Sequence, residues 1–358
     1  MRSIKQIKKD LKGRKVLVRV DFNVPINNGV ILDDFRIRKS LTTIKFLIDS
    51  GASVILITHL GKDGSESLEP IIKRFFKISK FPKTKISFFD NIRKFDGEIK
   101  NDLVFAKELS KLGDIYVNDA FSVSHRVHSS IVSLPKYLPS YAGFQLEEEI
   151  KNLSKVIKNV KHPFLYIAGG AKFSTKLPLL KKYLKLADNI FIGGALSNSF
   201  LKVKGYEVGK SLVDKDNHDI KKIINNKKII LPIDVFVKSS NKFLIKKIDQ
   251  IGKEEDIIDI GKNTIDDLAK IIKSSKMILW NGPLGEYESG GEKATKKIMN
   301  ILFDQKNKEI IIGGGDLVSC IPKSIVGKLK SNMFVSTGGG ATLDFLVNGT
   351  LPGIKALG

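Results

Sequence analysis

Hydrophobic residues along the chain follow two alternating patterns. Short apolar runs rich in Val, Ile and Phe end in polar or glycine-rich turns, and stretches with apolar residues at helical spacing follow several of them. The apolar runs cover residues 15–20, 53–58, 86–89, 114–119, 163–169, 189–194, 228–237, 276–282, 309–315 and 333–339. The helical stretches cover residues 34–50, 68–76, 145–160, 175–186, 264–274 and 292–304. This alternation predicts an α/β fold in which helices cover both faces of parallel sheets.

The residues at the predicted strand ends divide the chain in two. Up to about residue 145 these ends carry arginine, histidine, asparagine and aspartate, whereas after about residue 160 they carry glycine. Between them, Leu146, Ile150, Leu153, Val156 and Val160 recur at helical spacing. We therefore predict an N-terminal domain over 1–145, a connecting helix over 146–160 and a C-terminal domain over 161–344.

Composition narrows the class of protein. No run of 18 apolar residues is present, the first residues lack the apolar core of a signal peptide, and Cys320 is the single cysteine. These features exclude an internal disulfide and Cys-cluster metal sites, and we expect a cytoplasmic protein with no membrane partner. The net charge is +23, but the lysines are spread along the whole chain, so we expect no nucleic-acid partner.

Glycine clusters mark the second half of the chain. They follow five apolar runs, at 169–170, 193–194, 282–285, 313–315 and 338–340. Glycine at the carboxyl ends of parallel strands lets backbone N–H groups approach phosphate oxygens, although one such loop alone is often only a tight turn. Lys172 and Lys176 lie just after the first cluster, so either phosphate contacts or solvated lysines would account for them.

One glycine-containing stretch resembles a phosphate-binding motif but does not match its spacing. The stretch GYEVGKS at 205–211 resembles a P-loop, but three residues separate its glycines instead of four, and no apolar run precedes it. No G-x-G-x-x-G occurs either, which disfavours a dinucleotide enzyme.

Cationic and amide side chains recur in the first half. RVDFNVP follows the first apolar run, and DDFRIRK, THLGK, DNIRK and NDAFSVSHRVH supply further arginines, histidines and a lysine. Carboxyl ends of parallel strands meet at one edge, so these side chains predict a site for a small anion with phosphate and carboxylate groups.

These motifs together resemble the phosphoglycerate kinase family. RVDFNVP, THLGK, VNDAFSVSHRVH, AGGAKFSTK, FIGGALSNSFL, GYEVGKS, WNGPLGEYE, GGGD and STGGGATLDFL occur in the family's order over nearly the whole chain. The resemblance implies two Rossmann-like domains with parallel sheets facing a cleft and joined by a helix, with residues 345–358 packed back on the N-terminal domain. It also implies reversible phosphoryl transfer from 1,3-bisphosphoglycerate to ADP, giving 3-phosphoglycerate and ATP, by a monomer that uses Mg²⁺.

The resemblance also implies roles for individual residues. Arg36 and Lys176 would be catalytic, and Asp316 would bind Mg²⁺. The phosphoglycerate site would comprise Asp21, Phe22, Asn23, Arg36, His59, Leu60, Gly61, Lys62, Arg93 and Arg126. The nucleotide site would comprise Gly170, Ala171, Lys172, Lys176, Gly194, Asn281, Pro283, Glu288, Gly314, Gly315, Asp316, Leu317, Gly339 and Gly340, with Glu288 at the ribose.

The chain departs from the family pattern at two site positions. Lys62 stands where the family has arginine, which loses the bidentate fork. Leu317 stands where the family has a threonine that helps to bind phosphate, and losing one such contact costs on the order of 1.5–3 kcal/mol. The chain is also short between Lys62 and Arg93, so we predict an N-terminal domain that lacks roughly one strand and helix.

Three functions therefore compete. The first is an active phosphoglycerate kinase, and the second is a nucleotide-binding paralogue with weakened catalysis and a regulatory or structural role, suggested by Lys62 and Leu317. The third, a basic nucleic-acid-binding protein, is not supported by the scattered lysines.

Overall fold

The computed structural model describes residues 1–171, 173–214, 218–240, 242–321 and 329–358. The chain forms two compact units, which are described separately below. Unit 1 comprises Met1–Lys151 and Asn348–Gly358, and unit 2 comprises Asn152–Val347. The division falls within helix α5 (Phe144–Lys158), which covers most of the stretch in which the sequence predicts a connecting helix. None of the helices in the described ranges is long and apolar enough to cross a membrane.

Unit 1 is built on a five-stranded parallel sheet in the order β5-β4-β1-β6-β7. The strands are β1 (Lys15–Arg19), β4 (Ser53–Ile57), β5 (Ile86–Phe88), β6 (Ile115–Asn118) and β7 (Ser140–Ala142), and β2 (Ile26–Asn27) and β3 (Val30–Ile31) form a separate hairpin. The helices are α1 (Phe35–Asp49), α2 (Glu69–Ser79), α3 (Asp96–Ile99), α4 (Leu103–Ser110) and α14 (Pro352–Lys355). Short helical turns are η1 (Ile4–Asp10), η2 (Lys83–Lys85), η3 (Ile92–Lys94), η4 (Phe121–Val123), η5 (Ser129–Ser133) and η6 (Leu134–Lys136).

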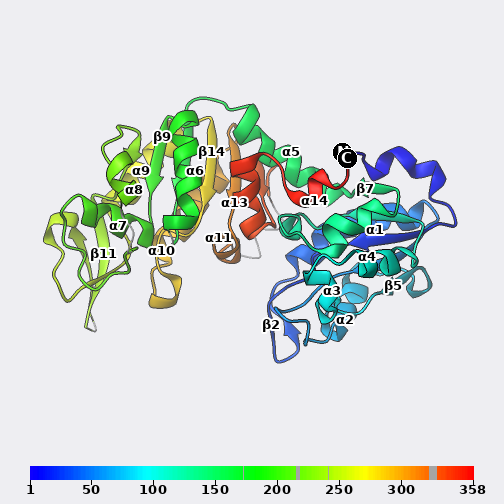
Figure 1. Cartoon of the computed structure of the whole chain (residues 1–358). Helices are drawn as coiled ribbons and strands as arrows, with labels where there is room; N and C mark the ends of the chain where they lie inside the picture. Colours follow the sequence, from blue (N-terminus) through cyan, green and yellow to red (C-terminus); the bar gives the residue numbers. More distant parts are fainter. Residues whose placement is uncertain (172, 215–217, 241, 322–328) are drawn as a thin grey trace. The chain divides into compact units, whose positions relative to one another are not determined.

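The C-terminal residues complete unit 1. The backbone N–H of Gly353, on α14, donates to the carbonyl of Ser124 at 2.8 Å. A Cβ on Gly353 would lie 2.7 Å from the side chain of Ile131, so only glycine allows this approach. Figure 1 shows α14 in red among the blue and cyan elements of unit 1.

Unit 2 contains a six-stranded parallel sheet in the order β10-β9-β8-β14-β15-β16. The strands are β8 (Phe164–Ala168), β9 (Asn189–Ile192), β10 (Ile229–Ile230), β14 (Met277–Asn281), β15 (Glu309–Gly313) and β16 (Met333–Val335). Every residue of the central strands β8 and β14 is buried, as expected for a parallel sheet covered on both faces. The helices are α6 (Phe173–Leu186), α7 (Ala195–Val203), α8 (His218–Ile223), α9 (Lys262–Ser274), α10 (Lys293–Asp304), α11 (Gly315–Ser319) and α13 (Gly339–Asn348), with short turns η7 (Ile248–Gln250) and η8 (Tyr287–Ser289).

One small sheet differs from the sequence expectation. The apolar run at 228–237 is interrupted at Pro232, and its second part belongs to β11 (Asp234–Ser239). This strand lies between β12 (Lys242–Lys247) and β13 (Asp256–Ile260) in an antiparallel sheet of three strands. The expectation that all strands are parallel is therefore wrong here. Strand β12 escaped detection because it is largely exposed and lysine-rich, and so lacks an apolar run.

Candidate active site

Loops that follow four strands of unit 1 gather the predicted anion-binding residues. Strands β1, β4, β5 and β6 are parallel, so the loops at their carboxyl ends lie along one edge of the sheet. Asp21 and Asn23 follow β1, His59 follows β4, Arg93 follows β5 and Arg126 follows β6. Arg36 comes from the first turn of α1.

Asp21 links several of these loops. Its Oδ2 accepts a hydrogen bond from Arg36 Nη1 at 2.9 Å and another from the hydroxyl of Ser122, and its Oδ1 accepts from the Asn23 N–H at 3.0 Å. Arg36 Nη1 also donates to the Asn23 carbonyl at 2.9 Å. Burial by itself raises the pKa of Asp21, but the charge of Arg36 and the hydrogen bonds from Ser122 and Asn23 outweigh it, and the pKa is lowered to about 2. The ionised Asp21 therefore holds the Arg36 guanidinium in place.

His59 is buried among charged groups. Its Nδ1 lies 3.8 Å from Asp21 Oδ1 and 3.4 Å from Arg19 Nη2. Burial is the largest cause that lowers its pKa, Asp21 opposes this, and Arg19, Arg93 and Arg36 lower the pKa further, to about 3. His59 is therefore neutral at pH 7, so its approach to Asp21 is not an ion pair.

The loop after β4 is fixed by its neighbours. Arg93 Nη1 donates to the Gly61 carbonyl, and the Gly61 N–H donates to Asn23 Oδ1 at 3.1 Å. Asn91 Nδ2 donates to the Leu60 carbonyl at 2.8 Å. Burial first, and then the charges of Arg19 and Arg126, lower the pKa of Arg93. Positive charge is thus concentrated at the carboxyl edge of the sheet in unit 1. A bound anion would reduce the repulsion between these cations.

The remaining predicted residues of unit 1 lie in two environments. The side chains of Phe22 and Leu60 are buried in the hydrophobic core, and their N–H groups donate to Thr58 Oγ1 at 2.9 Å and to Asn91 Oδ1 at 3.3 Å. The side chains of Lys62 and Arg126 are exposed.

Arg19 was not predicted from the sequence. It is 1% exposed although it ends β1, and its Nε donates to Ser130 Oγ at 2.9 Å. The hydroxyl of Ser130 donates in turn to Glu98 Oε1 at 2.6 Å, and the Ser130 N–H donates to Glu98 Oε2 at 2.8 Å. Burial raises the pKa of Glu98, but His128, Arg19 and Ser130 outweigh it and lower that pKa. The one signal in the sequence is a single arginine within an otherwise apolar run.

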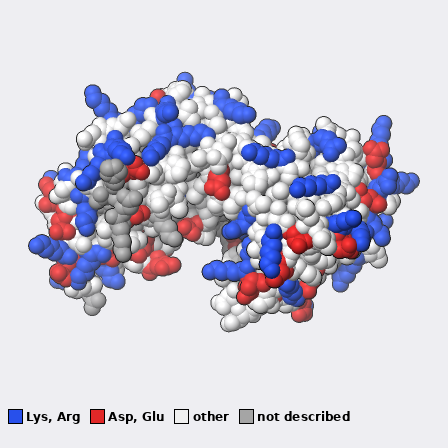
Figure 2. Space-filling view, in the orientation of Figure 1, with Lys and Arg blue, Asp and Glu red and all other residues white. Residues whose placement is uncertain are grey.

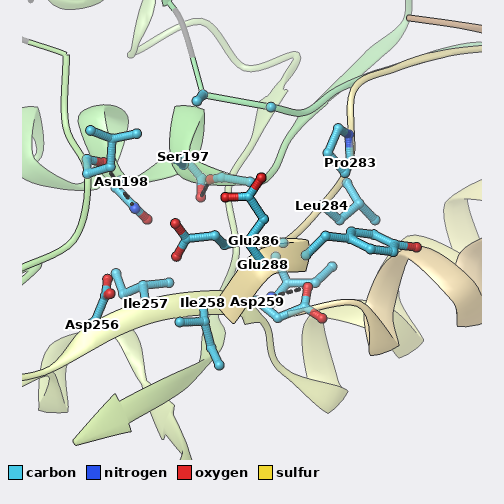
Figure 3. Close-up of a pocket in the computed structure, with 18 of the residues that line it drawn as sticks. Ser197, Asn198, Asp256, Ile257, Ile258, Asp259, Pro283, Leu284, Glu286 and Glu288 are labelled. Atoms are coloured by element: carbon cyan, nitrogen blue, oxygen red, sulfur yellow. Dashed lines mark hydrogen bonds between the residues drawn. The ribbon is translucent and has the colours of Figure 1, made fainter. Parts of the chain in front are cut away.

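Unit 2 contains two neighbouring cavities at the carboxyl edge of its parallel sheet. The larger has a volume of about 460 Å³ and the smaller about 420 Å³. Both are lined by Gly170, Ala171 and Asp316. Of the predicted residues, Gly194, Pro283 and Glu288 line only the larger cavity, which Figure 3 shows, and Lys176, Gly314, Gly315, Leu317, Gly339 and Gly340 line only the smaller one.

Some of the glycine loops pack against one another. The Gly170 N–H donates to the Pro283 carbonyl at 2.8 Å, and the Gly194 N–H donates to the Leu284 carbonyl at 3.0 Å. A Cβ on Gly282 would lie 2.4 Å from the carbonyl oxygen of Gly169. The N–H groups of Gly170 and Gly194 are therefore engaged within the protein.

The loops that begin α11 and α13 are open. A Cβ on Gly315 would have no atom within 4 Å, and one on Gly339 would meet nothing closer than the Gly315 nitrogen at 3.5 Å. The first N–H groups of a helix have no partner within that helix, so these loops can donate into the smaller cavity.

Lys176, on α6, is one of the residues that line the smaller cavity. It is 8% exposed, and its ammonium group donates to Asn281 Oδ1. Asn281 Nδ2 donates to the Gly313 carbonyl at 3.0 Å. Burial lowers the pKa of Lys176 to about 8, while Asp316 acts in the opposite direction.

Two residues that were expected at the nucleotide site, Asn281 and Lys172, are not among the described residues that line the cavities. Asn281 was expected to line the nucleotide site, but its side chain is fully buried and lines neither cavity, because it is bonded to Lys176 and Gly313. Lys172 lies outside the described residues. Asn198, Asp256 and Glu286 line the larger cavity and were not predicted from the sequence.

Comparison with protein families identifies one match. The family model described as phosphoglycerate kinase matches residues 4–80 and 76–349. Its two segments meet between β4 and β5, where the sequence predicts a missing strand and helix.

Curated relatives bear the same name. The phosphoglycerate kinase of Dictyoglomus turgidum is 39% identical over 383 positions, which cover 97% of this chain and 96% of the relative. That of Finegoldia magna is 41% identical over 394 positions, which cover 99% of each chain. Because this chain has only 358 residues, some of those positions have no residue here.

Solved structures share the whole fold. Phosphoglycerate kinase from Coxiella burnetii superimposes with a TM-score of 0.84 at 32% identity, covering 99% of this chain and 98% of the other. The enzyme from Pyrococcus horikoshii gives the same TM-score at 26% identity, covering 100% and 98%.

Proposed function

Because the chain belongs to the phosphoglycerate kinase family, we propose that the sites described above hold the two substrates of that family's reaction. The chain is a phosphotransferase with a carboxyl group as acceptor, which exchanges a phosphoryl group between 1,3-bisphosphoglycerate and ADP in glycolysis.

The phosphoglycerate binds at the carboxyl edge of the sheet in unit 1. The observation that carries this assignment is Arg36, held by Asp21 and the Asn23 carbonyl beside the buried neutral His59. Arg93 and the exposed Lys62 and Arg126 add cations for the phosphate and carboxylate groups. Phe22, Leu60 and Gly61 shape this edge, and their N–H groups donate to other residues of unit 1.

The nucleotide binds in the two cavities of unit 2. Its base and ribose occupy the larger cavity, with Glu288 at the ribose, and its phosphates occupy the smaller one. Lys176 and the N-terminal N–H groups of α13 hold the phosphates, since both favour negative charge.

Mg²⁺ fits the shared boundary of the two cavities. Asp316 is exposed and lines both, and no group of three or more His, Cys, Asp or Glu side chains in the described ranges could hold a metal alone. This suits Mg²⁺, which is commonly held by one carboxylate together with substrate phosphates. When bound, the ion neutralises phosphate charge.

Catalysis rests on position and charge. The acceptor carboxylate is already ionised at neutral pH, so its reaction needs no general base. The neutral His59 therefore has no role as a base in this proposal. Arg36 and Lys176 stabilise the charge of the phosphoryl group in transit, as preorganised cations do in phosphoryl transfer. We further propose that the protein is a cytoplasmic monomer.

A coupled assay of ATP formation from 1,3-bisphosphoglycerate and ADP tests the proposal. We expect turnover by the wild type and a fall in kcat of at least about 100-fold in Arg36→Lys, because lysine cannot keep both hydrogen bonds and still face the substrate. Arg38→Lys is a matched control on the same helix, where Arg38 pairs with Asp34 at 2.8 Å and is 54% exposed.

Two results would count against the proposal. Equal kcat values for Arg36→Lys and Arg38→Lys would show that Arg36 has no special role in the reaction. ADP binding without any turnover by the wild type would instead identify the chain as a nucleotide-binding paralogue.

A further inference from the structure

Asn198 is a buried amide on the wall of the larger cavity. It comes from α7, is 1% exposed and lines the cavity. Its Oδ1 is one of the buried side-chain atoms without a hydrogen-bond partner in the described part of the chain. A buried acceptor left unpaired is costly, so each such atom in a folded protein calls for an explanation.

The orientation of this amide is fixed. Asn198 Nδ2 donates to the Leu212 carbonyl at 3.2 Å. A carbonyl can only accept, so the NH₂ group must face Leu212 and the oxygen must point elsewhere. Turning the amide over would place two acceptors against each other. Oδ1 is therefore held ready for a donor that the described protein does not supply.

The surroundings of Asn198 suit a flat, donor-bearing group. Leu212, Ile257 and Leu284 supply apolar surface to the same cavity, and Asp256 and Glu286 supply further acceptors. Figure 3 shows Asn198, Asp256 and Ile257 on one side of this space, away from Pro283 and Leu284. Among the described residues of this lining the one lysine is Lys210, whose ammonium group is paired with Glu254 at 2.5 Å.

Asn198 lies away from the phosphate end. The two cavities share Gly170, Ala171 and Asp316, so a nucleotide spanning both passes these residues. Asn198 lines only the larger cavity. A group that extends past the shared residues to Asn198 is therefore the base rather than a phosphate.

We infer that Asn198 is a specificity-determining residue, whose Oδ1 accepts a hydrogen bond from the exocyclic amino group of an aminopurine such as adenine. The inference rests on the proposed function, which places the nucleotide in these cavities. A purine without the amino group leaves Oδ1 unpaired in the complex, so the site disfavours it.

Calorimetric titration with MgADP and with the 6-unsubstituted purine riboside diphosphate tests this role. We expect the wild type to bind MgADP about tenfold more tightly. In Asn198→Leu the two affinities become equal, because leucine has a similar size but no acceptor. Asn198→Ala provides the same comparison if the leucine variant does not fold.

Ser197→Ala is the matched control. Ser197 lines the same cavity, but its hydroxyl already donates to the Gly194 carbonyl at 2.7 Å. The ratio of the two affinities should stay at the wild-type value in this variant. If Asn198 only tethers the Leu212 segment, Asn198→Leu weakens both nucleotides equally and leaves the ratio unchanged, which overturns the inference.

The binding measurement separates this inference from the proposed function. Absence of turnover in the coupled assay would overturn the proposed reaction, whereas the affinity ratio depends only on nucleotide binding. Equal affinities of the folded wild type for the two nucleotides would overturn the role of Asn198 whatever the turnover.

Discussion

The ammonium group of Lys176 has little contact with water, and this makes its charge sensitive to pH. Burial lowers its pKa to about 8, whereas a bound phosphate would raise it again because opposite charges favour the ionised form. Nucleotide binding should therefore be coupled to proton uptake near and above pH 8.

We expect the affinity for ADP to fall as the pH rises from 7.5 to 9.5, by about tenfold in total. Calorimetric titration in buffers of different ionisation enthalpy would measure both the affinity and the protons taken up. Lys176→Arg, whose guanidinium stays charged over this range, should show neither effect. A wild-type affinity that is flat with pH would contradict this reading of Lys176.

Leu317 is the second residue of the nucleotide site whose substitution has a predictable effect. Its side chain is fully buried although the residue lines the smaller cavity, so in this chain the position offers only its backbone to a phosphate. Leu317→Thr should lower the KM for nucleotide by supplying a hydroxyl. It should also destabilise the fold by about 2–3 kcal/mol, because it removes buried apolar atoms.

Nucleotide kinetics together with urea unfolding would separate the two effects of Leu317→Thr. A KM that stays the same or rises would show that the leucine costs no phosphate contact. Val318→Thr, the next residue along α11 and only partly buried, controls for a general effect on this helix.

Charged residues such as Asp21, His59 and Arg93 could be proposed from the sequence because they follow apolar runs and match family motifs, whereas Asp256 and Glu286 were not proposed. Asn198 could not, since a neutral amide within a helical stretch gives no signal until its hydrogen bonds are known. The burial of the Asn281 side chain gave no signal either, because only the fold reveals its hydrogen bonds with Lys176 and Gly313.

At the scale of elements, Asp119 determines how α5 begins. Its Oδ1 accepts hydrogen bonds from the Gln145 N–H and the Thr43 hydroxyl, each at 2.9 Å. Burial raises the pKa of Asp119 to about 7, and these hydrogen bonds only partly offset it. Because the folded pKa lies above the unfolded value, the stability that this group contributes is present below about pH 4 and is lost as the pH rises through 7.

Asp119→Asn should remove this loss. Between pH 5 and 8 the free energy of unfolding of the variant should improve relative to the wild type by on the order of 2 kcal/mol. Urea unfolding at several pH values would measure it. Asp96→Asn, at a carboxylate that is 88% exposed, is the control, and identical pH profiles for wild type and Asp119→Asn would rule out the effect.

The edge strand β5 shows how unit 1 ends on one side. It has three residues, and Pro82, Lys83 and Lys85 precede or flank it, which discourages pairing with another chain. The aromatic rings of Phe75, Phe76 and Phe88 pack against one another beside it, with centroids 5.3–6.2 Å apart. These contacts cover the core where the sequence predicts that a strand and a helix are missing.

The six longest helices of the described ranges (α1, α2, α5, α6, α9 and α10) could be located from periodicity, but the elements that they pack against could not. The stretches at 264–274 and 292–304 are close to α9 and α10 as observed. Helices α4 and α7 were not predicted, because α4 is short and α7 is buried nearly all round and so lacks a polar face. The antiparallel sheet was missed because β12, which pairs with β11, is exposed and lysine-rich and so lacks an apolar run.

At the scale of the whole molecule, the net charge of +23 is dispersed. Figure 2 shows lysine and arginine spread over the visible face and interspersed with acidic residues. Several of the lysines pair with a carboxylate three or four residues away in or beside a helix, which is typical of a solvated surface.

We therefore expect a monomer with only weak, non-specific affinity for nucleic acid. Sedimentation equilibrium should give a mass near 39.8 kDa, and any binding to duplex DNA at 50 mM salt should disappear by about 200 mM. Binding that persists above that concentration, or a larger mass, would require a specific surface that the dispersed charge does not suggest.

The return of residues 348–358 to unit 1 has a consequence for synthesis. Every residue of unit 2 leaves the ribosome before the segment that carries Gly353. Unit 2 can thus complete its fold while unit 1, begun first, still lacks its last piece. Until translation has passed residues 348–358, chaperones would encounter unit 1 without this segment. A substitution in this segment would therefore impair the folding of unit 1, although most of unit 1 is synthesised first.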